Sequence, residues 1–187
     1  MGCTRQQLNV FFDDLLMPQR FKDYCPNGLQ VEGKTDVRHL VTGVTASQAL
    51  IEAARDRRAD AILVHHGYFW RSEPPCITGM KAARVRALIK ADINLFAYHL
   101  PLDCHPLHGN NAALGRLMGI EAPEALDPED PGTPVFRGQF EASVTARELA
   151  DRLSIALDRT PLVIGEGDVK SVAWCTGAGQ GYIDLAA

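Results

Sequence analysis

Two adjacent histidines, His65 and His66, follow an uninterrupted apolar run at residues 61–64. Neighbouring residues of a strand point to opposite faces, so two adjacent imidazoles converge only where the strand ends, and Gly67 permits a turn there. A pair of metal ions would satisfy this geometry, because each histidine could serve a different ion while a shared carboxylate lies between them. Two-metal hydrolytic sites hold their ions roughly 3.5–4 Å apart in this way. The tandem therefore predicts a dinuclear metal site.

A second polar pair, His99 and Asp103, follows the next apolar run at residues 93–98. Asp103 is the candidate for the bridging carboxylate. The histidine tandem could instead be a polar strand end whose imidazoles bind backbone carbonyls, but its position opposite a second His/Asp cluster favours metal. His105 and His108 lie in a proline-containing loop. We interpret them as residues that contact the ligands without binding the ions, or that lie at the surface.

The expected secondary structure brings both clusters to one edge of a sheet. Periodicity predicts a helix from Thr4, a strand at 40–42, a helix capped by Ser47, a strand at 60–64, a helix at about 79–91 and a strand at 93–98. This alternation is typical of an α/β fold with a parallel sheet covered by helices. Ligands of such sheets bind beyond the carboxyl ends of the strands, where both clusters lie. The turn-rich residues 27–33 are expected to form a loop.

The chain is expected to change architecture after residue 120. Residues 121–134 contain four prolines and five carboxylates, which is typical of a linker or a long surface loop. A strand at 135–140, a helix capped by Thr145 and short strands near 161–164 and 169–175 are expected to follow. We therefore predict a first α/β half at 1–120, a small inserted α+β module at 121–168, and the start of a second α/β half at 169–187.

The prediction of two related halves rests on an internal repeat. Residues 41–54 read VTGVTASQALIEAA and residues 175–187 read CTGAGQGYIDLAA, so a strand, a Thr-Gly pair, a loop and a helix recur. The repeat predicts two α/β halves with parallel-rich sheets flanked by helices. It also predicts that the natural protein continues for several tens of residues beyond this sequence.

Composition places the chain among globular proteins and excludes several function classes. It has 187 residues, 46% of them hydrophobic, and a formal charge of −4, which argues against a nucleic-acid surface. It contains no apolar stretch of the length that a membrane span needs. Five scattered cysteines without CxxC spacing suit reduced thiols in a cytoplasmic protein better than a disulfide framework.

Several segments together resemble one family. PNGLQVEG at 26–33, ADAILVHHGYFW at 59–70, DINLFAYHLPLD at 92–103 and GNNAALG at 109–115 are similar to the Nif-three-like family of GTP cyclohydrolase 1 type 2 homologues, in its proteobacterial branch. The resemblance covers essentially the whole chain. It implies a two-domain α/β fold, a toroidal homohexamer and a dinuclear metal site.

The resemblance also implies roles for individual residues. His65, His66 and Asp103 would be direct metal ligands, and His99 would lie in or against the site. A histidine and a glutamate from a C-terminal segment would complete the ligand set, and no residues of this sequence match that segment. The implied cofactor is two divalent ions of iron, zinc, manganese or nickel, since histidine and carboxylate ligands suit all four.

The chemistry expected of such a centre is attack of activated water on an electrophilic carbon or phosphorus atom. The family label implies opening of the GTP purine ring at C8, with His99 moving a proton. Two alternatives stay open at this point. One is a non-enzymatic metal-binding scaffold or regulatory protein, and the other is a phosphoesterase or amidohydrolase acting on a different small molecule.

Overall fold

The computed structural model describes residues 2–130 and 132–187, and the chain divides into two compact units, Met1–Pro101 and Leu102–Ala187. This division follows contacts within each unit. The predicted boundaries at 120 and 168 rest on an acidic linker and a sequence repeat, and they stay a prediction. Within the described residues, no helix has the length and apolar character that crossing a bilayer requires.

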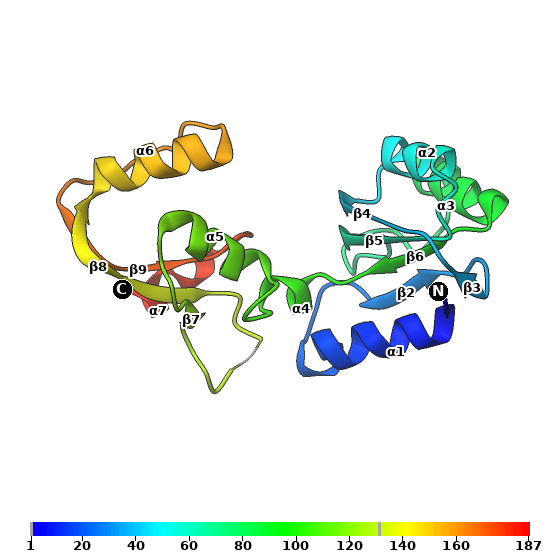
Figure 1. The fold of residues 1–187 in the computed structure, drawn as a ribbon, viewed down its shortest axis with the longest axis horizontal. Helices are drawn as coiled ribbons and strands as arrows, with labels where there is room; N and C mark the ends of the chain where they lie inside the picture. The colour runs from blue at the N-terminus through cyan, green and yellow to red at the C-terminus, as the bar shows by residue number, and fades with distance from the viewer. Residues whose placement is uncertain (1, 131) are drawn as a thin grey trace. The chain divides into compact units, whose positions relative to one another are not determined.

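The first unit is built on a four-stranded mixed sheet (Figure 1). Its order is β2 (Gly28–Val31), β6 (Asn94–Ala97), β5 (Ala61–His66) and β4 (Leu40–Thr45). Strands β4, β5 and β6 are parallel, as the sequence predicts. Helices α2 (Gln48–Asp56) and α3 (Gly79–Ala91) lie on one face, and α1 (Arg5–Leu16) lies on the other. A two-stranded antiparallel pair joins β1 (Cys3–Thr4) to β3 (Asp36–Val37).

The expectation of a loop at 27–33 is wrong. Residues Gly28–Val31 form strand β2, which runs antiparallel to β6 and pairs Gly28 with Ala97. A register shift before Val31 breaks the alternation of buried and exposed residues, and the flanking turn-forming residues conceal so short an edge strand. The sheet is therefore mixed rather than purely parallel.

Helix boundaries follow local chemistry. Thr4 and Gln7 form a reciprocal capping box at the start of α1, with N···O distances of 2.9 and 3.1 Å. The Ser47 hydroxyl accepts a hydrogen bond from Leu50 N–H at the start of α2, at 3.2 Å. Asp92 ends α3 with a left-handed φ of 55°. These ends fix where the chain enters the strands that carry the histidines.

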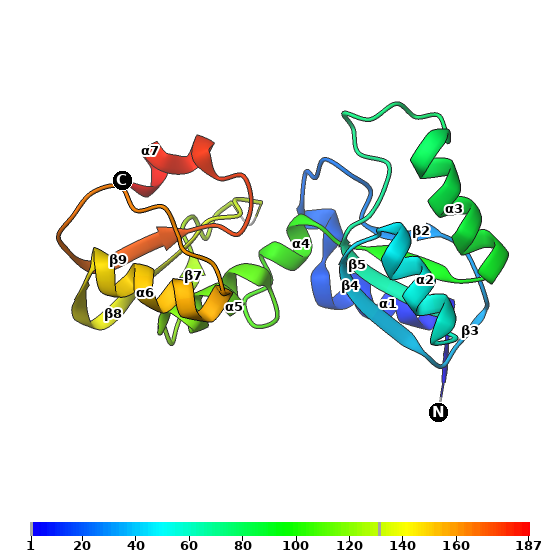
Figure 2. The same ribbon diagram turned by 90° about the horizontal axis from the view of Figure 1, so that it is seen from above.

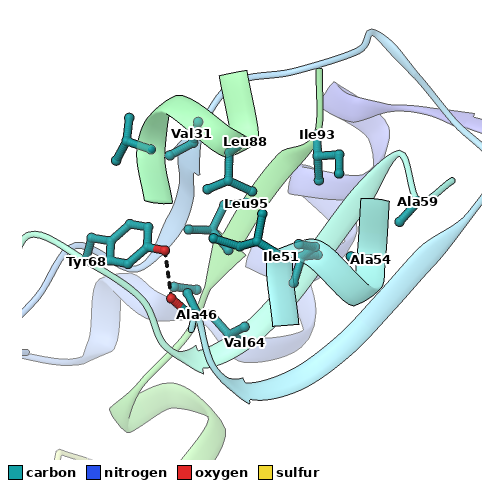
Figure 3. Packing of buried hydrophobic residues seen from close by; sticks show 13 residues of the cluster. Val31, Ala46, Ile51, Ala54, Ala59, Val64, Tyr68, Leu88, Ile93 and Leu95 are labelled. Atoms are coloured by element: carbon teal, nitrogen blue, oxygen red, sulfur yellow. Dashed lines mark hydrogen bonds between the residues drawn. The ribbon is translucent and has the colours of Figure 1, made fainter. Parts of the chain in front are cut away.

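The core of the first unit lies between the sheet and helices α2 and α3 (Figure 3). Ile51, Leu88 and Leu95 pack there with almost no exposed surface. Tyr68 belongs to the same core and donates a hydrogen bond from its hydroxyl to Ala46 O, at 2.7 Å. The segment after the histidine tandem is therefore anchored in the core rather than free at the surface.

The second unit is built on a three-stranded antiparallel sheet (Figures 1 and 2). Its strands are β7 (Glu124–Ala125), β8 (Phe136–Thr145) and β9 (Asp168–Trp174). Helices α5 (Asn110–Met118) and α6 (Ala146–Leu157) pack over one face, where Phe136, Phe140 and Trp174 are buried. The short turns α4 (Leu100–Asp103), η1 (Pro18–Arg20), η2 (Gln180–Tyr182) and α7 (Ile183–Ala186) complete the described elements of the chain.

Most predicted elements after residue 134 are observed. Thr145 forms a capping box with Glu148 at the start of α6, and a strand covers 168–174. The expectation of a strand near 161–164 is wrong, because residues 160–166 have no regular structure. Pro161 lacks a backbone donor, and Leu162 and Ile164 are 88% and 90% exposed, so nothing described pairs with this segment.

Candidate metal centre

The structure brings His65, His66 and His99 together. His65 and His66 are the last residues of β5, and His99 follows the neighbouring parallel strand β6. The ring centroid of His65 lies 4.3 Å from that of His66 and 4.9 Å from that of His99. One nitrogen of each ring lies within 4.8 Å of the others. The convergence predicted from parallel strand ends is therefore observed for these three side chains.

All three imidazoles direct Nδ1 at an oxygen atom. The partners are Tyr98 O for His65 at 3.3 Å, Thr45 Oγ1 for His66 at 3.4 Å, and Asp23 Oδ1 for His99 at 2.7 Å. A carbonyl oxygen only accepts, so Nδ1 of His65 donates the proton in its hydrogen bond. For His65 and His99, whose partners only accept, Nε2 is then the nitrogen that the neutral ring offers, whereas the Thr45 hydroxyl can donate or accept and does not fix the tautomer of His66. Metal-binding histidines characteristically donate their other ring N–H to an oxygen in this way.

Asp23 is a site residue that the sequence analysis missed. Its carboxylate is 3% exposed. Burial favours the neutral acid, but hydrogen bonds from His99, from Asn27 and from the N–H groups of Leu100 and Tyr24 outweigh burial and hold the pKa of Asp23 below its usual range. It lies in an irregular loop after η1, where no periodic pattern marks it. The nearby Pro26-Asn27-Gly28 turn was the only local signal.

Asp23, Cys25 and His99 form a second group with ligand spacing. Cys25 is buried, and burial together with the negative charge of Asp23 raises the pKa of its thiol to about 12. Cys25 must lose its proton before it can bind a metal ion, whereas a neutral imidazole already offers a ligand nitrogen. The three-imidazole group is therefore the better candidate centre.

The turn after the tandem is fixed by Gln30 of strand β2. Gln30 Oε1 accepts from Tyr68 N–H at 2.7 Å, and Gln30 Nε2 donates to Tyr68 O at 3.1 Å. The ring of Trp70 then lies edge-on to His99 with centroids 4.9 Å apart. Strand β2, which the sequence analysis expected to be a loop, thus positions the turn that brings Trp70 against the histidine cluster.

Gly67 is required by close packing at this turn. An added Cβ would meet Gln30 Oε1 and would lie 2.6 Å from Ala97 Cβ. We expect Gly67→Ala to lower the free energy of unfolding by about 1–3 kcal/mol, the usual cost of overpacking, as measured by urea unfolding. Gly177→Ala is the matched control, because nothing lies within 4 Å of its added Cβ. Equal stabilities of the two variants would contradict this account.

Asp103 belongs to the second unit and is 5% exposed. Its Oδ1 accepts from Asn110 Nδ2 at 2.8 Å and from Thr176 Oγ1 at 3.2 Å. Asn111 Nδ2 donates to its backbone oxygen at 3.2 Å. The GNN segment and the second Thr-Gly pair, which the sequence analysis singled out, therefore hold this carboxylate. Its role as a metal ligand stays a prediction.

His105 and His108 have ring centroids 5.0 Å apart. His105 Nδ1 accepts hydrogen bonds from the N–H groups of Leu107 and His108, at 3.2 and 3.0 Å. Burial and the neighbouring charge of His108 lower the pKa of His105. His105 stabilises the turn of its own loop, which agrees with its interpretation as a residue outside the ligand set.

Comparison with known proteins decides the family. The model of the Duf34/NIF3 (NGG1p interacting factor 3) family matches residues 3–187. This chain belongs to the Duf34/NIF3 family. The resemblance predicted from the sequence is thereby confirmed.

Relatives of this Duf34/NIF3 chain are similar over nearly all of its length. The "GTP cyclohydrolase 1 type 2 homolog" of Vibrio cholerae is 54% identical over 185 residues, covering 97% of this chain and 73% of the relative. The protein of the same name from Pseudomonas aeruginosa is 50% identical over 175 residues, covering 93% and 69%.

Two solved structures share the fold. One, described as "protein ybgI, unknown function", has a TM-score of 0.89 at 46% identity and covers 97% of this chain and 73% of that one. TTHA1606 of Thermus thermophilus has a TM-score of 0.88 at 34% identity, covering 98% and 74%. The α/β fold, with a mixed sheet flanked by helices and a small antiparallel sheet, is therefore that of its relatives.

Proposed function

We propose that this Duf34/NIF3 chain is a dinuclear metal-binding protein and a metal-dependent hydrolase of the GTP cyclohydrolase type. His65, His66 and Asp103 are the proposed ligands, and His99 is the proposed proton-transfer residue. One observation carries the proposal: three imidazoles cluster with one nitrogen of each ring within 4.8 Å of the others, and Nδ1 of His65 and of His99 is bonded to an acceptor oxygen.

The donor set fits the implied metals. Imidazole nitrogens suit iron, zinc, manganese and nickel, and the three ring nitrogens lie within 4.8 Å of one another. When bound, divalent ions supply a hydroxide equivalent at neutral pH. His65 and His66 would hold the ions, Trp70 restricts water on one side of His99, and His99 accepts a proton at Nε2 while its Nδ1 stays bonded to Asp23.

The proposed substrate class follows from the relatives' names. Several are called GTP cyclohydrolase 1 type 2 homologues, and opening of a purine ring at C8 requires addition of water to an electrophilic carbon. This is the chemistry that a metal-bound hydroxide beside a proton acceptor supports.

The proposal extends to assembly and to the relation between the two α/β halves. We propose that the chain self-associates as a homohexamer and that residues 1–120 and 169–187 belong to two related α/β halves. Support for self-association comes from apolar side chains in the second unit that no described residue covers, among them Ile155, Leu162 and Ile164, at 84%, 88% and 90% exposure.

Metal removal and reconstitution test the proposed function. The full-length protein is expected to contain divalent metal by elemental analysis, to turn over GTP, to lose turnover with a chelator and to regain it when a divalent ion is added. Retention of turnover in metal-free protein would contradict the proposal. Loss of assembly without any turnover at any stage would favour the scaffold alternative, with oligomeric mass followed by light scattering.

A further inference from the structure

The Asp23 carboxylate receives four hydrogen bonds although it is nearly fully buried. Oδ1 accepts from His99 Nδ1 at 2.7 Å and from Tyr24 N–H at 2.6 Å. Oδ2 accepts from Asn27 Nδ2 and from Leu100 N–H, both at 2.9 Å. Donors from the side chains and backbone of two segments therefore fix both oxygens, which leaves the carboxylate little freedom to rotate.

The same loop also fixes the backbone of His99. Asn27 Oδ1 accepts from His99 N–H at 2.7 Å, while Asn27 Nδ2 donates to Asp23. Asp23 holds the ring and Asn27 holds the main chain, so the imidazole is constrained at both ends. This clamp comes from the loop between η1 and β2, far from His99 in the sequence, and it is contained within the first unit.

His99 differs from the other two imidazoles in the charge of its partner. The Nδ1 partners of His65 and His66 are a neutral carbonyl and a neutral hydroxyl at 3.3 and 3.4 Å. The partner of His99 is a carboxylate at the shorter distance of 2.7 Å. Charge-assisted hydrogen bonds are shorter and stronger than neutral ones, and a carboxylate bonded to one nitrogen of a histidine makes its other nitrogen more basic.

We propose that Asp23 is a positioning residue for the metal centre, holding His99 in the Nδ1–H tautomer so that its unprotonated Nε2 faces the centre as a proton acceptor. A neutral imidazole carries one ring proton, and an ionised carboxylate only accepts, so that proton lies on Nδ1. The inference rests on the proposed metal centre. It adds a residue that touches neither metal nor substrate and acts through His99.

Asp23→Asn tests the inference, with the full chain as the sample. Zn²⁺ affinity, measured by competition with a chromophoric chelator, is expected to fall about 10–100-fold, the usual cost of losing a residue that orients the groups around a metal centre. Asp14→Asn removes the same charge from an exposed position of α1, and its Zn²⁺ affinity is expected to match that of the wild type. Circular dichroism establishes that both variants are folded.

Nitrogen-15 NMR of the metal-free wild type gives a second readout that needs no variant. The His99 ring is expected in the Nδ1–H tautomer at neutral pH. An Nε2–H ring in the wild type, or Asp23→Asn affinity equal to that of Asp14→Asn, would overturn the inference. His65→Ala separates this failure from failure of the metal centre itself. If His65→Ala leaves metal content unchanged, the proposed centre is wrong, whereas if it removes metal and Asp23→Asn does not, only the positioning role is wrong.

Discussion

His65→Ala is expected to remove most of the divalent metal from the full-length protein while leaving the fold intact. His65 is the penultimate residue of strand β5 and is only partly buried, in contrast to Ile62 and Val64 before it. Its deletion costs a ligand and one hydrogen bond to Tyr98 O. Loss of a ligand should exceed the roughly 10–100-fold cost of losing a group behind one. Elemental analysis after dialysis against metal-free buffer measures the metal content, and thermal unfolding of the metal-free protein checks the fold.

An exposed histidine of the same unit gives the matched control. His39 lies just before β4, and its side chain belongs to neither ligand group. His39→Ala is expected to keep the metal content of the wild type. Equal metal content in His65→Ala and His39→Ala would contradict the proposed dinuclear metal site. Loss of metal together with a large loss of stability of the metal-free protein would show instead that His65 is a structural residue.

The part of the site that could be predicted from the sequence is the part that strand topology controls. Parallel neighbours place their carboxyl ends at one edge, and the observed register pairs Val64 with Ala97, just before each histidine cluster. Knowing the apolar runs and their connecting helices was therefore enough to bring His65 and His99 together. Caps at Thr4, Ser47 and Thr145 were equally local and equally predictable.

The parts that were missed depend on contacts distant in sequence. Strand β2 forms because its backbone pairs with β6, some 65 residues later, and its short apolar pattern is too weak to indicate this alone. Asp23 acquires its role only because the loop after η1 folds against the end of β6, where His99 and Leu100 donate to it. A carboxylate in a loop has no periodicity, so one sequence cannot distinguish it from a solvated acid.

Asn94 supplies the second large expected effect. It is the first residue of β6 and has no exposed surface. Its Oδ1 accepts from Gly33 N–H at 2.8 Å, and its Nδ2 donates to Lys34 O at 2.8 Å and to Asp60 O at 3.0 Å. One amide thus joins the segment after β2 to the residue just before β5. Two partly buried backbone groups, Gly33 N–H and Lys34 O, depend on it for a partner, whereas Asp60 O also accepts from Asn94 N–H at 3.0 Å.

Asn94→Leu is expected to lower the free energy of unfolding of the first unit by about 2–4 kcal/mol. The substitution keeps a similar volume, but each backbone group left buried without a partner costs about 1–3 kcal/mol, and partial rearrangement limits the sum. Urea unfolding followed by Trp70 fluorescence measures the effect, in a Trp174→Phe background that silences the tryptophan of the second unit.

Asn9→Leu is the matched control for the effect of Asn94→Leu on the free energy of unfolding. Asn9 lies on a partly exposed face of α1, and its side-chain amide donates to a single partner, Asp13 Oδ2, at 2.7 Å. Water can replace that bond, so Asn9→Leu is expected to cost about 1 kcal/mol or less. Gly33, which Asn94 holds, has no room to move, because an added Cβ there would lie 2.7 Å from Asn94 N. The backbone around Asn94 therefore cannot shift far enough to find new partners. If Asn94→Leu proves no more destabilising than Asn9→Leu, the three bonds do not hold these strands in place.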